Sequence, residues 1–337
     1  MIEVEHIVKD YGTRRAVDDI SFSMQKGKIY GFLGPNGAGK STTMNIMTGY
    51  LAATSGVVRI NGHDILGEPM IAKKDIGFLP EIPPVLLDFT VTEYLRYAAR
   101  LKNIPIRCTR DAQAKVLQMT GLGAVRTRLI KNLSKGYKQR VGLAAALIGL
   151  PEIIILDEPT VGLDPAQIIE IRNLISSLRD EHTVVLSSHI LSEVSSVCDE
   201  LIIISHGKIA AEGTQAELEE KYCANNGLVL RAMSKLDKVM TVLKRISGVK
   251  RIDILDAEEP VSFLIQANNQ NEIQEMTARA LFEEGIPVYE MYHRQQSLEE
   301  VFLNATNSTQ SFFDLQRAKT PFVNIAAEDS FSAEEEN

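Results

Sequence analysis

The 337-residue sequence predicts an α/β fold with a mostly parallel core sheet, followed by a small α+β domain and a polar tail. Short apolar runs, which suit strands buried on both faces, alternate with helical patterns as far as about residue 225. Beyond that point strands and helices follow another order, and from residue 306 onward the periodicity ends. Apolar residues make up 45% of the chain, enough for a sizeable core.

The first strands predict an antiparallel β subdomain. Residues 20–24 alternate apolar and polar side chains, the pattern of a half-buried strand, and the chain then turns into the apolar run Lys28–Leu33. Val57–Ile60 reads as another strand, closed by a turn at Asn61 and Gly62.

The segment Gly34–Ser41 fits the phosphate-loop (P-loop) pattern G-x-x-x-x-G-K-[ST] between a predicted strand and a helix that opens at Thr42. Glycines let successive backbone N–H groups turn toward one anion, and the helix N-terminus adds partial positive charge. Lys40 can reach the β- and γ-phosphates, and the Ser41 hydroxyl can hold Mg²⁺. A glycine-rich turn that binds nothing is the alternative. The candidate ATP contacts are Gly34, Pro35, Asn36, Gly37, Ala38, Gly39, Lys40, Ser41 and Thr42.

The middle of the chain predicts a helix-rich insert, about residues 82–150, and then the rest of the parallel core. Helical spacing begins near residue 92, with Tyr94, Leu95, Ala98 and Leu101 on one face. The later core strands are 153–156, 183–187 and 201–204, and a helix begins at Asp164 and Pro165.

Residues 226–305 predict a small ferredoxin-like domain, because their strands and helices follow the order βαββαβ. The strands are 228–232, 249–255, 261–267 and 287–291, and the helices are 236–246 and 273–282. Residues 306–337 hold six acids against two bases and lack periodicity, so we expect an acidic, disordered tail.

Charge and cysteine content exclude several classes of protein. Half of the net charge of −8 comes from the tail. The sequence has no stripe of basic residues, which would indicate a nucleic-acid partner. The chain has an odd number of cysteines, and they are far apart in the sequence: Cys108, Cys198 and Cys223. This argues against a disulfide framework or a metal knuckle and favours a reduced, cytoplasmic compartment. Met1–His6 carries acids where a signal peptide carries bases. The uncharged stretch Val141–Leu150 is ten residues long, against the ~20 that span a bilayer.

Two adjacent carboxylates follow the predicted strand 153–156. Asp157 stands where it can hold Mg²⁺, and Glu158 can take a proton from an attacking water. Alone, this pair would usually be a solvated turn. Its place after the phosphate loop and before Pro159 favours the catalytic interpretation.

The segment Leu133–Tyr137 resembles the signature motif of ABC-transporter ATPases, and the resemblance covers residues 1 to about 220, within a predicted ATPase domain of residues 1–225. Tyr11 resembles the aromatic residue that stacks on adenine, Val161–Asp164 the D-loop, and His189 the switch histidine. Taken singly, Tyr11 could be an ordinary core or surface tyrosine, and His189 a histidine satisfied at a strand end.

The resemblance implies an ATPase with two subunits, a homodimer, and two ATP molecules between them. Each ATP would touch the phosphate loop of one subunit and Ser134 with Gly136 of the other, and Asp164 of the D-loop is a further candidate ATP contact. It implies catalytic roles for Glu158, His189 and Lys40, and Mg²⁺ ligands among Ser41, Asp157 and Glu81.

Three residues depart from the common family pattern: Lys135 where glycine is commoner, Tyr137 in place of glutamine, and Glu81 at the Q-loop glutamine. These variants resemble the subunits that serve separate ABC-2-type export permeases of drug, sodium and gliding-motility systems. That resemblance implies a cytoplasmic subunit held at the inner face of the membrane by a multi-span permease. Ser297–Phe302 resembles the end of such subunits, although a simple amphipathic helix is an equal interpretation.

Two other functions compete with export. A soluble ABC-type ATPase of ribosomes or DNA usually carries two cassettes or a long coiled-coil insert, and this chain has one phosphate loop and no sustained heptads. An idle regulatory partner would lack Lys40, Asp157 or Glu158, and all are present. The apolar segment Glu81–Thr90 is the candidate docking groove for a permease, unless its side chains fold back onto the insert.

Overall fold

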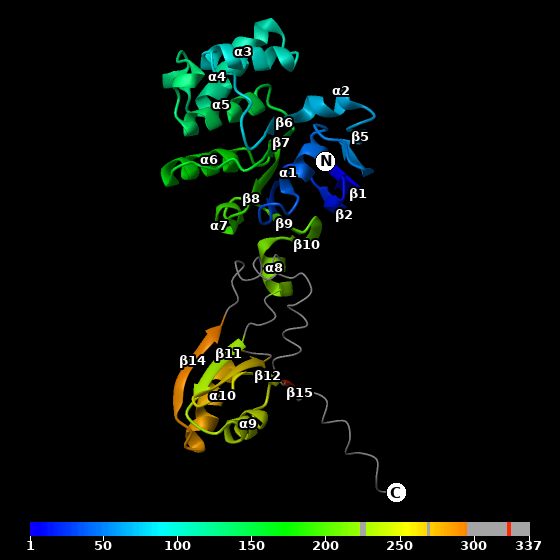
Figure 1. Ribbon diagram of the computed structural model, residues 1–337. Coiled ribbons are helices and arrows are strands. Elements are labelled where there is room, and N and C mark those ends of the chain that lie inside the picture. The colour runs from blue at the N-terminus through cyan, green and yellow to red at the C-terminus, as the bar shows by residue number, and fades with distance from the viewer. Residues whose placement is uncertain (223–226, 268–269, 295–321, 325–337) are drawn as a thin grey trace. The chain divides into compact units, whose positions relative to one another are not determined.

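A computed structural model of the protein describes residues 1–222, 227–267, 270–294 and 322–324 (Figure 1). The chain divides into two compact units, Met1–Ala216 and Glu217–Asn337. Within the described residues, no helix is long and apolar enough to cross a bilayer.

The core of the first unit is a six-stranded sheet in the order β10-β9-β3-β8-β7-β6. The neighbouring strands from β9 to β6 run parallel, and β10 pairs antiparallel with β9 at one edge. Strands β3, β7 and β8 are buried along their whole length, as continuous apolar runs require. The predicted, mostly parallel α/β core is therefore confirmed. The strands are β3 (Ile29–Leu33), β6 (Ile76–Leu79), β7 (Ile153–Leu156), β8 (Thr183–Ser188), β9 (Glu200–Ser205) and β10 (Lys208–Gly213).

A four-stranded antiparallel sheet in the order β2-β1-β4-β5 forms the β subdomain. Asn61 and Gly62 turn β4 into β5 with φ values of 51° and 85°, the left-handed conformation that a two-residue hairpin turn needs. The two sheets share one apolar core, in which the rings of Phe22 and Phe32 lie 5.8 Å apart. The strands are β1 (Ile2–Tyr11), β2 (Arg14–Met24), β4 (Ser55–Ile60) and β5 (His63–Asp64).

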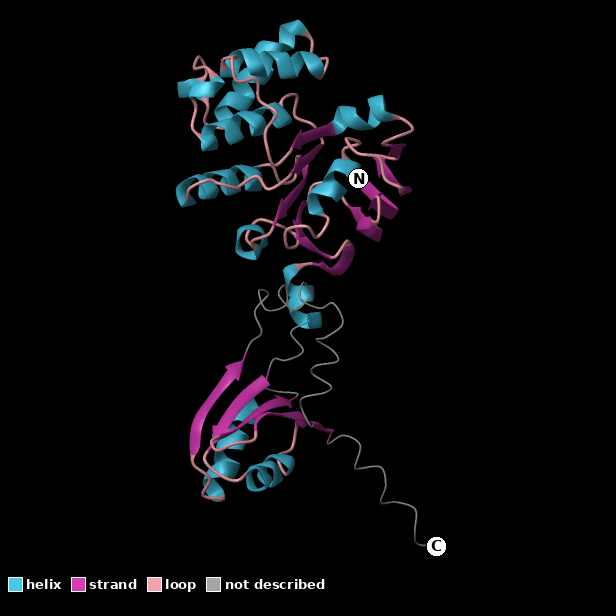
Figure 2. Ribbon diagram, viewed as in Figure 1, coloured by secondary structure: helices cyan, strands magenta, loops and turns pink. Residues whose placement is uncertain are grey.

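Helices flank the core sheet, as Figure 2 shows in cyan. Asp164 caps α6 as predicted, since its Oδ1 accepts a hydrogen bond from the Gln167 N–H at 2.9 Å and Pro165 follows at the first helical position. The helix after the phosphate loop begins at Lys40. The helices are α1 (Lys40–Met47), α2 (Pro69–Ala72), α6 (Pro165–Ser177), α7 (Leu191–Ser195) and the 3₁₀ helix η1 (Lys73–Asp75).

The predicted helical insert contains α3 (Val91–Leu101), α4 (Ile106–Met119), α5 (Lys135–Leu147) and the short 3₁₀ helices η2 (Gly123–Val125) and η3 (Ile130–Asn132). A capping box begins α3, with Glu93 N donating to Thr90 Oγ1 and Thr90 N donating to Glu93 Oε2. The predicted helical spacing is confirmed, since Tyr94, Leu95, Ala98 and Leu101 all lie on α3, and the side chain of Leu101, its last residue, is 65% exposed.

Lys102, at the end of α3, ties the insert to the core. Its ammonium donates hydrogen bonds to the carbonyl oxygens of Ile76 at 3.3 Å and Ala146 at 3.2 Å. Burial lowers the pKa of Lys102 from its ordinary value of 10.5 to about 8.

This pKa shift predicts a pH dependence of stability. Between pH 8 and 10.5 the unfolded chain holds a proton on Lys102 that the folded chain has released. The free energy of unfolding should therefore rise with pH across this window, relative to a Lys102→Met variant in which nothing titrates at this position. Urea unfolding of both proteins at several pH values tests this, and a difference that stays constant with pH would contradict it.

Helix α8 (Gln215–Tyr222) spans the boundary between the two units. The rest of the second unit contains the predicted βαββαβ motif. The four strands of this βαββαβ motif have the order β14-β11-β13-β12 within a five-stranded sheet, and all three pairs are antiparallel, which confirms the ferredoxin-like topology. Both helices pack on one apolar core with the sheet, through side chains such as Val239 and Leu281. The elements are β11 (Gly227–Ala232), α9 (Leu236–Lys244), β12 (Val249–Asp256), β13 (Val261–Ala267), α10 (Gln270–Glu283) and β14 (Val288–Arg294).

Within the predicted tail, β15 (Phe322–Asn324) pairs antiparallel with β12. The rest of the tail and the segment Ser297–Phe302 lie outside the described residues.

Candidate functional site

A cavity of about 630 Å³ opens where the parallel strands β3, β6, β7 and β8 end. The loops after these strands supply most of its walls, and the β subdomain supplies the rest. This is the edge at which parallel α/β sheets bind ligands. The lining residues are Tyr11, Arg14, Ala16, Asn36, Gly37, Gly39, Lys40, Ser41, Thr42, Glu81, Glu158, Val161 and His189.

The phosphate loop needs its glycines for both conformation and space. Gly37 and Gly39 have φ values of 80° and 112°, which L-residues rarely adopt. A Cβ on Gly39 would lie 2.7 Å from the Ala16 carbonyl oxygen, and one on Gly34 would collide with the carbonyl oxygen of Ile204. The loop can therefore bring its backbone close to a ligand without side chains intervening.

The Lys40 side chain lies under the loop and is only 6% exposed. Its ammonium donates hydrogen bonds to the carbonyl oxygens of Gly34 at 2.7 Å and Pro35 at 3.3 Å. Ala38 is buried, and its N–H donates to the Pro35 carbonyl at 3.1 Å. The loop is thus held closed around a cation that faces the cavity.

The two carboxylates after β7 are buried, with Asp157 3% and Glu158 5% exposed. The Ser187 hydroxyl joins them, donating to Asp157 Oδ1 at 2.6 Å and accepting from the Glu158 N–H at 2.8 Å. Glu158 has a φ of 48°, the left-handed region where a non-glycine backbone is strained and functional residues are concentrated. Glu158 also lines the cavity.

The Glu158 carboxylate lies between two basic side chains within the cavity. Its Oε1 lies 3.4 Å from Lys40 Nζ, and its Oε2 lies 3.0 Å from Nδ1 of His189. The His189 side chain is 40% exposed, so its other ring nitrogen remains available to a ligand. A carboxylate held between a lysine and a histidine is suited to orienting and deprotonating a water molecule.

Tyr11 stands at the opening of the cavity with half of its surface exposed. The Lys9 ammonium lies 5.3 Å from the centre of its ring. The exposed ring face can stack on an aromatic base, and Arg14, its cross-strand partner in the β1–β2 hairpin, lines the same wall.

Ser41 and Glu81 bring a hydroxyl and a carboxylate to the cavity, and Asp157 precedes Glu158. These hard oxygen donors fit Mg²⁺. Among the described residues, no group of three or more His, Cys, Asp or Glu side chains forms a complete metal cage. A Mg²⁺ ion here would need phosphate oxygens and waters to complete its coordination, as in nucleotide sites.

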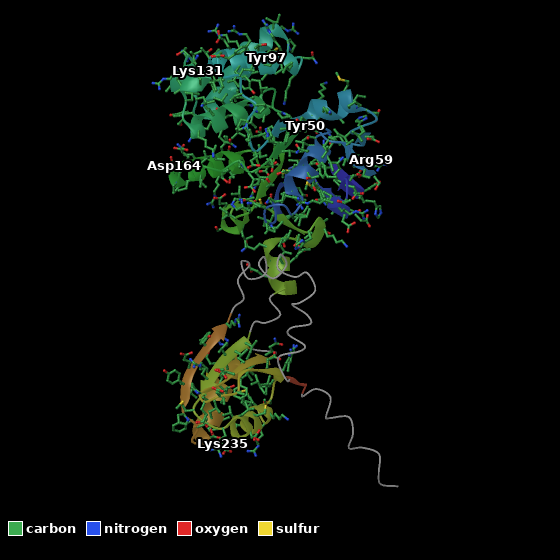
Figure 3. All side chains as sticks on the ribbon, viewed as in Figure 1. Tyr50, Arg59, Tyr97, Lys131, Asp164 and Lys235 are labelled. Atoms are coloured by element: carbon green, nitrogen blue, oxygen red, sulfur yellow. The ribbon has the colours of Figure 1, made fainter. Side chains whose placement is uncertain are left out.

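The signature residues lie outside this cavity in the same chain. Ser134 caps α5, its Oγ accepting from the Tyr137 N–H, and Gly136 is buried where a Cβ would collide with Oε1 of Gln167. Asp164 lines a separate cavity of about 670 Å³ with Tyr137 and Gln167. Figure 3 labels Asp164 at the start of α6, and Tyr97 and Lys131 on the helical insert.

Sequence reasoning missed three residues around the cavity: Arg14, Ala16 and Ser187. Ser187 had a usable signal, because it is a buried polar residue near the end of strand β8, at the same sheet edge as the predicted carboxylates. Arg14 and Ala16 had none, since only the pairing of β1 with β2 and the packing against the phosphate loop bring them to the site.

Comparison with known proteins gives consistent matches. The family model described as ABC transporter matches residues 17–161. The bacitracin transport ATP-binding protein BcrA of Bacillus licheniformis is 33% identical over 90% of this chain and 96% of its own length. The daunorubicin/doxorubicin resistance ATP-binding protein DrrA of Streptomyces peucetius is 33% identical over 90% of this chain and 92% of its own. The dimeric post-hydrolysis structure of the ATP-binding cassette MJ0796 with ADP and Pi has a TM-score of 0.59 and 25% identity, covering 64% of this chain and 98% of that one.

Proposed function

The chain belongs to the ABC transporter family of ATP-binding proteins, and from this premise we propose that it is the ATP-hydrolysing subunit of an export system whose permease is a separate protein. The observation that carries the proposal is the cavity in which the phosphate loop, Glu158 and His189 meet. The relatives named for bacitracin transport and for daunorubicin/doxorubicin resistance support the export class.

The geometry supports a division of labour in hydrolysis. The loop N–H groups and Lys40 bind the β- and γ-phosphates and oppose the charge that develops as the γ-phosphoryl group leaves. Glu158 accepts the proton of the attacking water, and His189 holds that carboxylate in place. Tyr11 stacks on the adenine.

A Mg²⁺ ion would be held by Ser41, with Asp157 and Glu81 as carboxylates near it, and would neutralise phosphate charge when bound. Ser187 fixes the Asp157 carboxylate for that role through its 2.6 Å hydrogen bond. Glu81 adds a negative charge where a glutamine would be neutral.

We propose that two copies of the chain share each ATP. Ser134, Gly136 and Asp164 do not line the phosphate-loop cavity of their own chain, so they are available to a nucleotide held by a second copy. The dimeric structure of the similar cassette MJ0796 supports an association of this kind. The charge distribution gives no reason to expect a nucleic-acid partner.

The permease would dock on the apolar segment Glu81–Thr90, so that the subunit lies peripherally on the inner face of the membrane. Exposure of its apolar side chains supports this: Ile82 is 82% exposed, and Leu86, Leu87 and Phe89 are also exposed. The apolar surface continues onto α3, where the ring of Tyr97 lies 6.3 Å from that of Phe89. A contiguous exposed apolar surface of this kind is typical of a protein interface.

Charged substitutions at this surface test the proposal. Leu86→Asp and Phe89→Asp should abolish co-purification with the permease when the two are co-expressed, because burying the new carboxylate would be costly. Basal ATPase activity should survive, since neither side chain lines the nucleotide cavity. Phe282→Asp, at an exposed position in the second unit, is the control. A folded Leu86→Asp protein that still co-purifies would show that the permease docks elsewhere.

A further inference from the structure

Lys135, the first residue of α5, is a cation without a partner in the described structure. Its ammonium makes no hydrogen bond or ion pair with any described residue, whereas two neighbouring cations are paired, Lys131 with Asp88 and Arg140 with Glu170. The first turn of α5 holds no acidic residue. A positive charge at a helix N-terminus is electrostatically unfavourable, so the local helix gives no reason for a lysine at this position.

The Lys135 side chain is nevertheless held in a definite place. It lies across Gly162, whose φ is 72°, and a Cβ built on Gly162 would collide with Lys135 Nζ and lie 2.7 Å from Cε. The left-handed backbone therefore favours glycine at position 162, and a Cβ there would displace the end of the lysine side chain. This contact restricts a long side chain that would otherwise be free, and Lys135 directly follows the exposed Ser134 in the chain.

A second departure from the family pattern, Glu81, suggests a role for the positive charge of Lys135. Glu81 brings a carboxylate into the nucleotide cavity, in addition to Glu158, so the cavity is more negative than one with a glutamine there. The added carboxylate repels the triphosphate, and an added positive charge would offset this repulsion. Lys135 cannot supply it within its own chain, because it does not line that cavity.

We propose that Lys135 contacts the γ-phosphate of the nucleotide bound by the partner subunit, donating a charge-assisted hydrogen bond that offsets Glu81 there. This rests on the proposed function, in which Ser134 and Gly136 face that nucleotide. Lys135 is a phosphate-binding residue of the composite site, and Gly162 is the residue that positions it. A group that contributes only on closure strengthens the ATP-bound dimer and leaves the affinity of a single chain unchanged.

The test uses the full chain with Glu158→Gln, so that ATP is retained, and measures ATP- and Mg²⁺-dependent dimerisation by analytical ultracentrifugation. Lys135→Met keeps the length and packing of the side chain on Gly162 and removes only the charge. It should weaken ATP-driven dimerisation by about tenfold or more, the effect of losing a hydrogen bond to a charged group. Binding of a fluorescent ATP analogue to the single chain should be unchanged. Lys138→Met, one residue beyond the signature on α5, is the matched control and should dimerise normally.

Equal dimerisation of Lys135→Met and the parent would overturn the inference. So would a result in which Lys135→Met is normal and Lys135→Ala is impaired, because the lysine would then act only by packing on Gly162. Ser134→Arg separates this failure from that of the proposed function. If Ser134→Arg blocks dimers while Lys135→Met does not, only the inference about Lys135 fails. If the parent does not dimerise with ATP, or Ser134→Arg dimerises normally, the shared-site proposal fails with it.

Discussion

Replacing Glu158 by glutamine is expected to leave ATP binding intact and to lower hydrolysis by roughly 10²–10⁴-fold, the usual contribution of a positioned general base. Glutamine keeps the size of the side chain and its contact with His189 but cannot accept a proton from water. The Glu158 backbone conformation and its hydrogen bond to Ser187 do not depend on the carboxylate, so the site should keep its shape.

The measurement is steady-state phosphate release together with equilibrium ATP binding. Glu152→Gln is the control, because Glu152 is a surface carboxylate paired with Lys26 outside the cavity, and its loss should leave turnover near normal. Near-normal turnover of the Glu158→Gln protein would assign proton transfer to another group.

The parts of the fold that the sequence predicts well are those with strong local signals. The run Ile153–Leu156 is wholly apolar and β-branched at three of its positions, and it forms a strand buried on both faces. The phosphate loop combines a strand, fixed glycines and a helix start within a few residues, so its place at the sheet edge follows from the sequence. The βαββαβ order likewise predicts its sheet, because few topologies connect it without crossings.

What the sequence could not predict depends on contacts between distant segments. Arg14 reaches the cavity only because β1 and β2 pair in a register that places it opposite Tyr11. The close approach of Lys135 to Gly162 joins two segments that have no local signal for each other. Leu101 fits a helical pattern in sequence, yet α3 turns it toward solvent, where it adds to an exposed apolar surface.

The proposed division of the nucleotide site between two chains likewise cannot be predicted from local sequence. The cavity collects groups from the phosphate loop, the strand ends and the β subdomain, while Ser134 and Gly136 lie on the helical insert away from it. Spacing along the chain cannot say which chain's nucleotide these residues serve. An experiment that mixes two inactive variants can show which chain's nucleotide they serve.

A mixture of Lys40→Ala and Ser134→Arg subunits is expected to recover hydrolysis that neither variant has alone. Lys40→Ala removes the cation under the phosphate loop and weakens nucleotide binding. Ser134→Arg places a bulky side chain at the start of α5, where the partner's nucleotide would lie. In the mixed dimer, the intact loop of one subunit faces the intact signature of the other, and the second site carries both defects.

With random pairing and independent sites, an equal mixture should reach about one quarter of the wild-type rate, because half of the dimers have one working site of two. Differently tagged subunits, purified in sequence, isolate the mixed dimers for assay. A dimer of wild-type and Lys40→Ala subunits is the control, because it shows whether one intact site is sufficient for turnover. If that control is active and the Lys40→Ala/Ser134→Arg dimer is not, Ser134 serves the nucleotide of its own chain, and the shared-site model is wrong.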